Sequence, residues 1–333
     1  MKIINHSNVD YIFQLGYGYW KSEVLFAGVE FDIFTLLSKG KLTSKDISKS
    51  IKANKRATEM LLDALVSLSL LDKQSNYYKN SEISNMYLVK GSPYYLGDSI
   101  HHFHNIVENW SMLRETIETG KAISIKELPE DVDPHDLRDF ITAMHNIASI
   151  RTEELCKKVN LKKSKTLLDV AGGPGTYAIA LAKANPHLQA TVLDLEQVTK
   201  LTQEFIKSAG LKDRVFTQAG NCLEDNLGKD KYDAILVSNL LHIYNPKNNI
   251  KILKKCWHAL KQGGQIIIHE FVLDKTRTKP QFAALFSLNM LIGTQKGASY
   301  TEPEYKSWLK NTGFKGIKKI DLKINSSLII GRK

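Results

Sequence analysis

From residue 165 onward, short apolar runs typical of strands alternate with amphipathic runs typical of helices, and this alternation constrains the fold more than any other feature. The strand-like runs are "TLLDVAG", "QATVLDLE", "RVFTQAGN", "YDAILVSNLL" and "QIIIHEFVLD". Strands that alternate with helices build a parallel sheet with helices on both faces, and ligands bind at the carboxyl ends of its strands. We therefore expect an α/β fold with a doubly wound sheet and a ligand site at that edge.

The first 95 residues have a different pattern, in which helical segments precede a turn-rich hairpin. "EFDIFTLLSKG" has apolar residues at helical spacing up to Gly40, and Thr43 with Asp46 marks a helix start. "RATEMLLDALVSLSLL" is a long amphipathic helix before the polar "DKQSNYYKNSE". Three helices and a hairpin are the winged-helix arrangement, which also occurs in DNA-binding proteins.

The leucines of the long helix help to decide whether this winged-helix region binds DNA or a partner subunit. They cover more than one face of the helix, which suits burial against a partner better than insertion into a DNA groove. We therefore expect residues 1–95 to form a dimerisation domain, with a DNA-binding protein as the alternative. We expect residues 96–160 to be a helical linker that contributes to a substrate pocket. Residues 161–333 should form the catalytic domain, closed by a strand hairpin in "GFKGIKKIDLKINSSLIIGRK".

The charge of the chain raises the question of an anionic partner. The 333 residues contain 46 Lys and Arg against 35 Asp and Glu, which gives a net charge of +11. The lysines are scattered singly and in pairs, and no Arg-rich run is interleaved with aromatic residues. We interpret the excess as solvated surface and expect no nucleic-acid partner.

Other composition features exclude several classes of protein. No apolar stretch approaches the roughly 20 residues of a membrane-spanning helix, and the N-terminus lacks the features of a signal peptide, so we expect a cytoplasmic protein with no membrane partner. Cys156, Cys222 and Cys256 are too far apart for a zinc or redox motif. The adjacent histidines of "HHFH" at 101–104 point in different directions on a helix, so we expect no metal site.

The segment "TLLDVAGGPGTYAIALA" reads as strand, glycine-rich turn and helix, and it fits two cofactors. Gly173 and Gly175 match the spacing of a dinucleotide site, and Asp194 lies where an acid could bind ribose. Asp169, at the end of the strand, favours the other cofactor, because its carboxylate would repel a pyrophosphate. S-adenosyl-L-methionine carries a sulfonium and an ammonium and no phosphate, so a carboxylate beside the turn suits it.

Three blocks of the sequence resemble the signature blocks of small-molecule O-methyltransferases, the caffeate, hydroxyindole and bacterial polyketide-tailoring enzymes. They are "LLDVAGGPGTYAIALAKANPHLQATVLDLEQV", "YDAILVSNLLHIYNPKNNIKILKKCWHALKQGGQIIIHE" and "LNMLIGTQKGASYTEPEYKSWLKNTGF". The N-terminal region is similar to the winged-helix dimerisation region of that family. The resemblance implies a class I methyltransferase fold, S-adenosylmethionine as cofactor, a small hydroxylated substrate and a homodimer formed through the N-terminal domain.

The resemblance also implies roles for individual residues. His242, after the fourth strand, corresponds to the base that removes the proton of the acceptor hydroxyl, and imidazole is suited to this because its ordinary pKa of about 6.5 leaves it neutral. Glu270, at the end of the next strand, resembles the acid that orients the base. The expected cofactor-binding residues are Asp169, Gly172, Gly173, Gly175, Asp194, Leu195, Gly220, Asn221, Cys222 and Ser238.

Several positions depart from the family pattern. Ile243 and Tyr244 follow the base where many relatives carry Asp-Trp, and Ser299 stands where an acid is usual. Asn221 replaces an acid that faces adenine, and its amide can still form a hydrogen bond. Some relatives keep the cofactor and catalyse hydroxylation, decarboxylation or rearrangement. Such non-methylating chemistry is therefore the nearer alternative to methyl transfer.

The acceptor site is the least constrained part of the sequence. An apolar and aromatic wall would suit a flat ring, and ordinary core packing is the rival reading for each residue. The candidate substrate-binding residues are Phe103, Trp110, Met144, His145, Met290 and Thr294.

Overall fold

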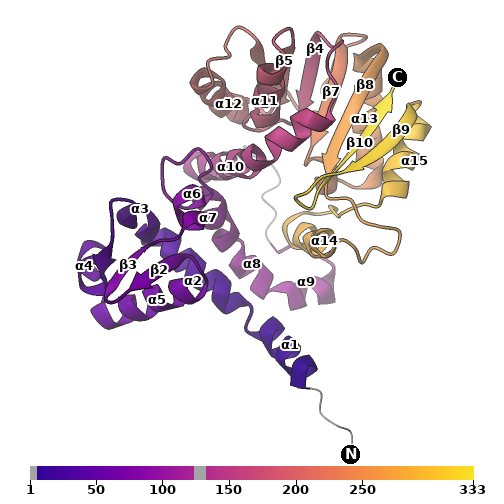
Figure 1. Cartoon of the computed structure of the whole chain (residues 1–333). Helices are drawn as coiled ribbons and strands as arrows, with labels where there is room; N and C mark the ends of the chain where they lie inside the picture. Colours follow the sequence, from indigo (N-terminus) through magenta and orange to yellow (C-terminus); the bar gives the residue numbers. More distant parts are fainter. Residues whose placement is uncertain (1–5, 124–132) are drawn as a thin grey trace, which may run out of the picture. The chain divides into compact units, whose positions relative to one another are not determined.

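The computed structural model describes residues 6–123 and 133–333 (Figure 1). The chain forms two compact units that meet in sequence at Ile106 and Val107. The helical linker expected over residues 96–160 is therefore divided between the two units. In the described ranges, no helix is both long enough and apolar enough to span a membrane.

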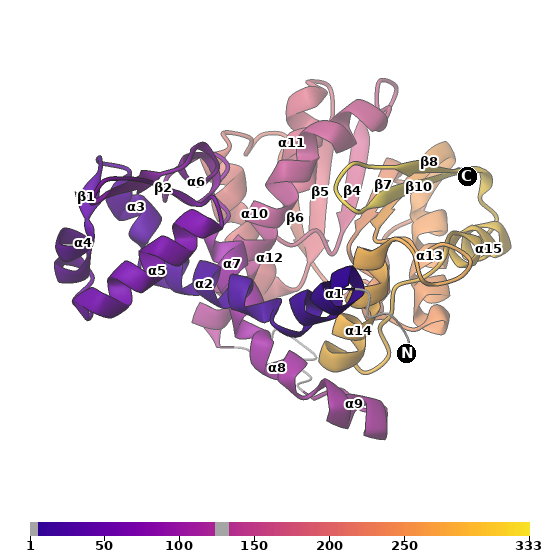
Figure 2. The same ribbon diagram turned by 60° about the horizontal axis from the view of Figure 1, so that its bottom comes forward.

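The first unit contains several short helices and a small sheet (Figure 2). The three strands of this sheet have the order β1-β3-β2. Its helices and strands are α1 (His6–Gly16), α2 (Tyr19–Glu30), α3 (Ile33–Leu37), β1 (Leu42–Thr43), α4 (Ser44–Ser50), α5 (Lys55–Ser67), β2 (Leu71–Gln74), β3 (Tyr77–Asn80), α6 (Glu82–Tyr87) and α7 (Gly97–Asn105). Strands β2 and β3 pair antiparallel, which confirms the expected hairpin.

Two local features of this unit test the sequence reasoning. Thr43 and Asp46 form the expected capping box at the start of α4, with each side chain accepting a hydrogen bond from the other's backbone N–H. The long helix predicted up to Leu71 was too long, because α5 ends at Ser67. Ser69 adopts a left-handed backbone with φ of 59°, and Leu71 then begins β2 and is buried in the core.

The second unit contains the long sheet and the helices that surround it. Its elements are α8 (Val107–Ser111), α9 (Leu113–Thr119), α10 (Pro134–Lys158), β4 (Thr166–Val170), α11 (Thr176–Ala184), β5 (Gln189–Asp194), α12 (Glu196–Ser208), β6 (Val215–Ala219), β7 (Tyr232–Ser238), the 3-10 turn η2 (Leu241–Ile243), α13 (Pro246–Ala259), β8 (Leu260–Glu270), α14 (Gln281–Gly293), α15 (Glu302–Thr312), β9 (Lys315–Asp321) and β10 (Ser327–Arg332).

The sheet has seven strands in the order β6-β5-β4-β7-β8-β10-β9. Strands β4 to β8 are parallel, and β10 pairs antiparallel with both β8 and β9. This confirms the doubly wound α/β sheet and its terminal hairpin. Strand order reverses between β4 and β7, and this switch point is where ligands of open α/β sheets bind.

Helices cover both faces of this sheet (Figure 1). Leu167, Leu236 and Ile267 pack with residues of α10, α11 and α12, whereas Leu168 and Ile266 pack with residues of α13 and α15. Because successive side chains of a strand point to opposite faces, both faces of each strand must be apolar. This explains why the strands read as continuous apolar runs in the sequence.

Candidate active site

The turn between β4 and α11 brings backbone close to a carboxylate. A Cβ added at Gly172 would lie 2.7 Å from the carboxyl group of Asp169, a distance that side chains do not tolerate. Gly175 has a φ of 71°, and a Cβ there would crowd Thr202 and Val192. The turn therefore requires glycine for two reasons, close approach and left-handed backbone.

Asp194, at the end of β5, holds this turn from the neighbouring strand. Its Oδ2 accepts a hydrogen bond from the Gly173 N–H at 2.7 Å, and its Oδ1 accepts one from the Leu195 N–H at 2.8 Å. Burial raises the pKa of the Asp194 carboxyl above its ordinary value, although these two hydrogen bonds lower it. Each oxygen keeps a further lone pair, so the carboxylate can also accept from ligand hydroxyls.

Asp169 lies at the end of β4 in a different environment. Its side chain is 1% exposed, and neither carboxyl oxygen has a hydrogen-bond partner among the described residues. Burial raises the pKa of Asp169 to about 7; the nearby charge of Asp194 contributes to this rise, and the backbone N–H of Ala178 opposes it. A buried carboxylate with so little compensation is costly, and a cation placed beside it would stabilise its charge.

The turn after β6 brings together three further predicted residues. Gly220 donates its N–H to the Asp194 carbonyl at 2.9 Å, and Asn221 donates its own to the Asp225 carboxylate at 2.7 Å. Burial raises the pKa of the Cys222 thiol to about 11, so this thiol is neutral. Sequence reasoning missed Asp225, although the turn-forming "GNCLED" was a signal for a carboxylate near Asn221.

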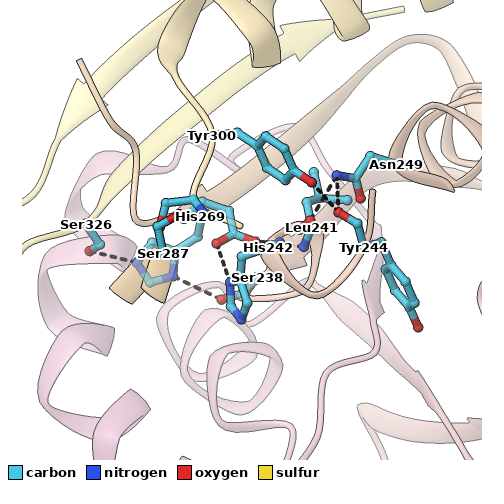
Figure 3. Close-up of polar contacts among 11 residues, drawn as sticks. Ser238, Leu241, His242, Tyr244, Asn249, His269, Ser287, Tyr300 and Ser326 are labelled. Atoms are coloured by element: carbon cyan, nitrogen blue, oxygen red, sulfur yellow. Dashed lines mark hydrogen bonds and ion pairs between the residues drawn. The ribbon is translucent and has the colours of Figure 1, made fainter. Parts of the chain in front are cut away.

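His242 and Glu270 meet at the carboxyl ends of β7 and β8 (Figure 3). The His242 Nδ1 lies 2.7 Å from the Glu270 Oε2, and the two side chains are 9% and 0% exposed. The other oxygen, Oε1, accepts the backbone N–H of Leu241 at 2.8 Å and that of His242 at 3.4 Å. Glu270 therefore fixes both the imidazole ring and the turn that carries it.

This contact assigns the imidazole tautomer. An ionised carboxylate only accepts hydrogen bonds, so the His242 Nδ1 carries the proton and the Nε2 keeps a lone pair. The Phe286 ring packs edge-on against the imidazole at 4.9 Å, and the Phe271 ring stacks on it at 6.2 Å. The ring is thus held by an acid on one nitrogen and by aromatic surfaces on its faces.

Three residues fix the backbone around His242. The Asn249 side-chain amide donates to the Leu241 carbonyl at 2.9 Å, and the Tyr300 hydroxyl donates to the Tyr244 carbonyl at 2.5 Å (Figure 3). The backbone N–H of Ala298 donates to the His242 carbonyl at 2.9 Å. These contacts from α13 and from the loop after α14 make the turn a rigid support.

A second buried histidine lies next to Glu270 on the opposite face of β8. The His269 Nδ1 lies 3.0 Å from the Ser238 Oγ, and its Nε2 lies 2.9 Å from the Ser326 Oγ (Figure 3). The side chain is fully buried, and burial lowers the pKa of His269 to about 4; Glu270 opposes this shift and Arg151 adds to it. Sequence reasoning missed this network, although the position of His269 between strand residues indicated burial.

The expected acceptor residues do not share one environment. Trp110 donates its indole N–H to the Asn289 side chain at 2.9 Å, which joins α8 to α14. The Thr294 hydroxyl donates to the Met290 carbonyl at 2.6 Å and accepts the Gly297 N–H at 2.9 Å, so it stabilises the end of α14. Phe103 belongs to the first unit, where it is exposed.

Met144 and His145 on α10 were also expected to line the acceptor site, and their surroundings differ from that expectation. The His145 Nδ1 lies 2.8 Å from the hydroxyl of Thr176, the first residue of α11 after the glycine turn. Its ring packs against Phe205 at 4.5 Å, and Met144 is half-buried. His145 therefore lies on the side of the glycine turn. Ser299 is 1% exposed, and its hydroxyl makes no hydrogen bond within the described residues.

Comparison with known families covers both units. Residues 114–315 match the O-methyltransferase domain, and residues 13–90 match the O-methyltransferase dimerisation domain. The chain is 33% identical to the 3-hydroxy-5-methyl-1-naphthoate 3-O-methyltransferase of Streptomyces sahachiroi, over 90% of this chain and 87% of that protein. It is 28% identical to an N,N-dimethyltransferase of Streptomyces rimosus, over 97% and 96% of the two chains.

The fold is also found in solved structures. The crystal structure of human N-acetylserotonin methyltransferase in complex with S-adenosylmethionine superposes with a TM-score of 0.91 at 24% identity, and the match covers 100% of this chain and 99% of that chain. The O-methyltransferase domain spans most of the second unit, and the dimerisation domain spans most of the first. The chain therefore belongs to the S-adenosylmethionine-dependent O-methyltransferases that carry an N-terminal dimerisation domain.

Proposed function

We propose that this enzyme methylates a hydroxyl group of a small aromatic or conjugated molecule, with His242 as the general base and Glu270 as the acid that orients it. The contact of 2.7 Å between the two side chains carries this proposal. A relative at 33% identity is named for methyl transfer to the 3-hydroxyl of a naphthoate, which supports an aromatic acceptor.

The base acts through its free nitrogen. The Nε2 of His242 accepts the proton of the acceptor hydroxyl, because Glu270 keeps the other proton of the ring on Nδ1. The positive charge that then develops on the imidazole is stabilised by the buried Glu270 carboxylate. When bound, S-adenosylmethionine supplies a methyl group on a positively charged sulfur, which is electrophilic without further activation.

The cofactor residues fit this ligand on the basis of charge and space. The buried Asp169 carboxylate suits the ammonium or sulfonium group, and the lack of a side chain at Gly172 lets the glycine turn lie directly against this carboxylate. Asp194 keeps acceptor capacity for the ribose hydroxyls. We assign the cradle to these residues together with Gly173, Gly175, Leu195, Gly220, Asn221, Cys222 and Ser238.

The aromatic cluster beside the base supports exclusion of water. Phe271 packs edge-on against Phe286 at 4.6 Å and against Phe282 at 5.0 Å. Apolar rings around the imidazole lower the local dielectric constant, which strengthens the interaction between Glu270 and a protonated His242.

The first test separates the role of His242 from the binding of cofactor. In His242→Ala, release of S-adenosylhomocysteine from a panel of hydroxyarenes should fall by about 10² to 10⁴, while the calorimetric affinity for S-adenosylmethionine stays within about twofold. Equal turnover in the variant would show that the histidine is structural. Arylamines in the same panel test the second candidate acceptor, which the relative named as an N,N-dimethyltransferase favours.

The same assay separates methyl transfer from the non-methylating alternative. Methyl transfer converts each S-adenosylmethionine consumed into one S-adenosylhomocysteine and one methylated product. A chemistry that only uses the cofactor's charge would change the substrate and leave S-adenosylmethionine intact. Mass spectrometry of the whole reaction mixture distinguishes the two outcomes.

We also propose that the enzyme is a homodimer formed through its first unit. Large apolar side chains are exposed on α1 and at the start of α2, including Phe13 at 61% and Trp20 at 58%. Exposed apolar patches of this kind are typical of association surfaces. In light scattering, Trp20→Asp should shift the protein toward the monomer, whereas Phe216→Asp, at an exposed aromatic residue of β6 in the second unit, should leave its mass unchanged. A monomeric wild type would contradict the proposal.

A further inference from the structure

The Arg151 guanidinium lies near the carboxyl ends of the sheet strands, the edge at which we expect ligands to bind (the ligand edge). It makes few hydrogen bonds or ion pairs with the protein. It lies on α10 and is half-buried. Its Nη1 donates to the carbonyl of Ile147 on the same helix at 2.8 Å, and its Nε is buried without an acceptor. Within the described ranges, no carboxylate forms an ion pair with it.

The environment of this guanidinium opposes its charge. Burial lowers the pKa of Arg151 below its ordinary value. A guanidinium stays protonated in proteins, so the unfavourable environment is not relieved by loss of the proton. Buried cations are normally paired with anions. An anionic group from outside the chain would relieve this cost.

The position of Arg151 connects it to the catalytic pair. Its Cζ lies 5.9 Å from the centre of the Phe271 ring, in a cation–π contact. Phe271 directly follows Glu270 and stacks on the His242 ring at 6.2 Å. One aromatic ring therefore contacts both the guanidinium and the proposed base.

A second donor lies close to Arg151. The Tyr177 hydroxyl is buried, and its interaction with the Ser238 side chain lowers the pKa of the phenol against the larger effect of burial. Tyr177 and Arg151 are near enough for the charge of each to influence the pKa of the other. Tyr177 is the second residue of α11 after the glycine turn. A guanidinium and a phenol are a donor set suited to a carboxylate.

We propose that Arg151 is an anion-binding residue of this active site, and that it pairs with a carboxylate of a bound small molecule with Tyr177 as a second donor. The inference rests on the proposed function for the location of the ligand edge. Two ligands can bring a carboxylate to this edge, the methionyl part of S-adenosylmethionine and an acceptor that carries its own carboxylate. Each source predicts a different result for the same variant.

The experiment measures binding by calorimetry, so it does not depend on turnover. The variants are Arg151→Gln and Arg151→Lys, with Arg138→Gln as the matched control because Arg138 is exposed on the same helix and pairs with Glu204. The cofactor probes are S-adenosylmethionine and its decarboxylated form. The acceptor probes, used with S-adenosylhomocysteine present, are 3-hydroxybenzoate and phenol.

Pairing with the cofactor predicts that Arg151→Gln loses at least about tenfold in affinity for S-adenosylmethionine and little for the decarboxylated form. Pairing with an acceptor predicts the same loss for 3-hydroxybenzoate and little for phenol. Arg151→Lys should restore part of either loss, and Arg138→Gln should resemble wild type.

The assignment is overturned if Arg151→Gln binds all four probes within twofold of wild type. It is also overturned if wild type does not distinguish either carboxylate from its carboxylate-free analogue. Melting temperatures of the variants establish that each is folded at the assay temperature. Failure of the proposed base would instead appear as unchanged turnover in His242→Ala with carboxylate recognition intact, so the two failures are distinguishable.

Discussion

The buried histidine beside Glu270 predicts a specific pH dependence of stability. Burial holds the pKa of His269 at about 4 in the folded protein, whereas an unfolded chain has the ordinary value of 6.5. As pH falls below 6.5, the unfolded state binds a proton that the folded state does not, so the free energy of unfolding decreases until pH about 4. At about 1.4 kcal/mol per pKa unit, the whole effect is about 3 kcal/mol.

About 2 kcal/mol of this loss should occur between pH 7 and pH 5, where the experiment is practical. Asp169 titrates in the opposite sense, because burial raises its pKa to about 7 and stability then falls as pH rises. The histidine must therefore be isolated by comparing wild type with His269→Gln, which does not titrate. In His135→Gln, which replaces an exposed histidine on α10, the pH dependence should match wild type.

The assay is urea unfolding at several pH values, followed by the fluorescence of the tryptophans, of which Trp110, Trp257 and Trp308 lie in the second unit. Wild type should lose about 2 kcal/mol more than His269→Gln from pH 7 to pH 5. NMR of labelled histidines measures the pKa of the ring directly. A difference curve that is flat within about 0.5 kcal/mol, or a folded-state pKa near 6.5, would refute the reasoning.

Three further predictions concern the site itself. In Glu270→Gln, an amide N–H faces the Nδ1–H of His242 and favours the wrong tautomer, so turnover should fall by about 10² to 10⁴ with cofactor affinity preserved. As pH increases toward 7, affinity for S-adenosylmethionine should rise by up to about tenfold per pH unit because Asp169 ionises, and calorimetry of Asp169→Asn should give a flat profile. Gly172→Ala should lower stability by about 1–3 kcal/mol and weaken cofactor binding because its Cβ meets the Asp169 carboxyl, whereas Gly293→Ala, which meets nothing within 4 Å, should unfold like wild type.

Most of the fold could be predicted from the sequence because the patterns that specify helices and strands involve residues close together in the chain. Strand and helix periods differ, and apolar residues on both faces of the strands marked a covered parallel sheet. The capping box at Thr43 was readable because its two partners are three residues apart. The end of α5 was not readable, since the leucines continue a helical pattern past Ser69, where the backbone turns left-handed and Leu71 enters β2.

The site residues also fall into two groups: those that could be predicted from the sequence around them, and those that depend on residues distant in the sequence. Asp169, the glycines and Asp194 could be assigned because a strand, a turn and a helix follow one another. The approach of Glu270 to His242 could be expected from adjacent strand ends, but the tautomer depends on a distance of 2.7 Å that the sequence does not contain. The anion-binding role that we propose for Arg151 has no local sequence signal, because it depends on the contact with Phe271, which lies 120 residues further along the chain.

The carboxylates of Glu270, Asp194 and Asp169, at three strand ends, differ in how many hydrogen bonds they accept from the protein. This difference distinguishes a carboxylate that supports the structure from one that is available to a ligand. Glu270 accepts hydrogen bonds from two backbone N–H groups and an imidazole, and Asp194 accepts from two backbone N–H groups. Asp169 is as deeply buried as Glu270; in the described part of the chain its oxygens make no hydrogen bond of normal geometry, and the nearby backbone N–H of Ala178 is the one group that favours its charge. Because leaving a buried carboxylate unsatisfied costs stability, its retention at this position is best explained by a cationic ligand group that compensates on binding. In the function that we propose, Glu270 therefore orients the base, Asp194 holds the turn, and Asp169 selects the charge of the ligand that binds there.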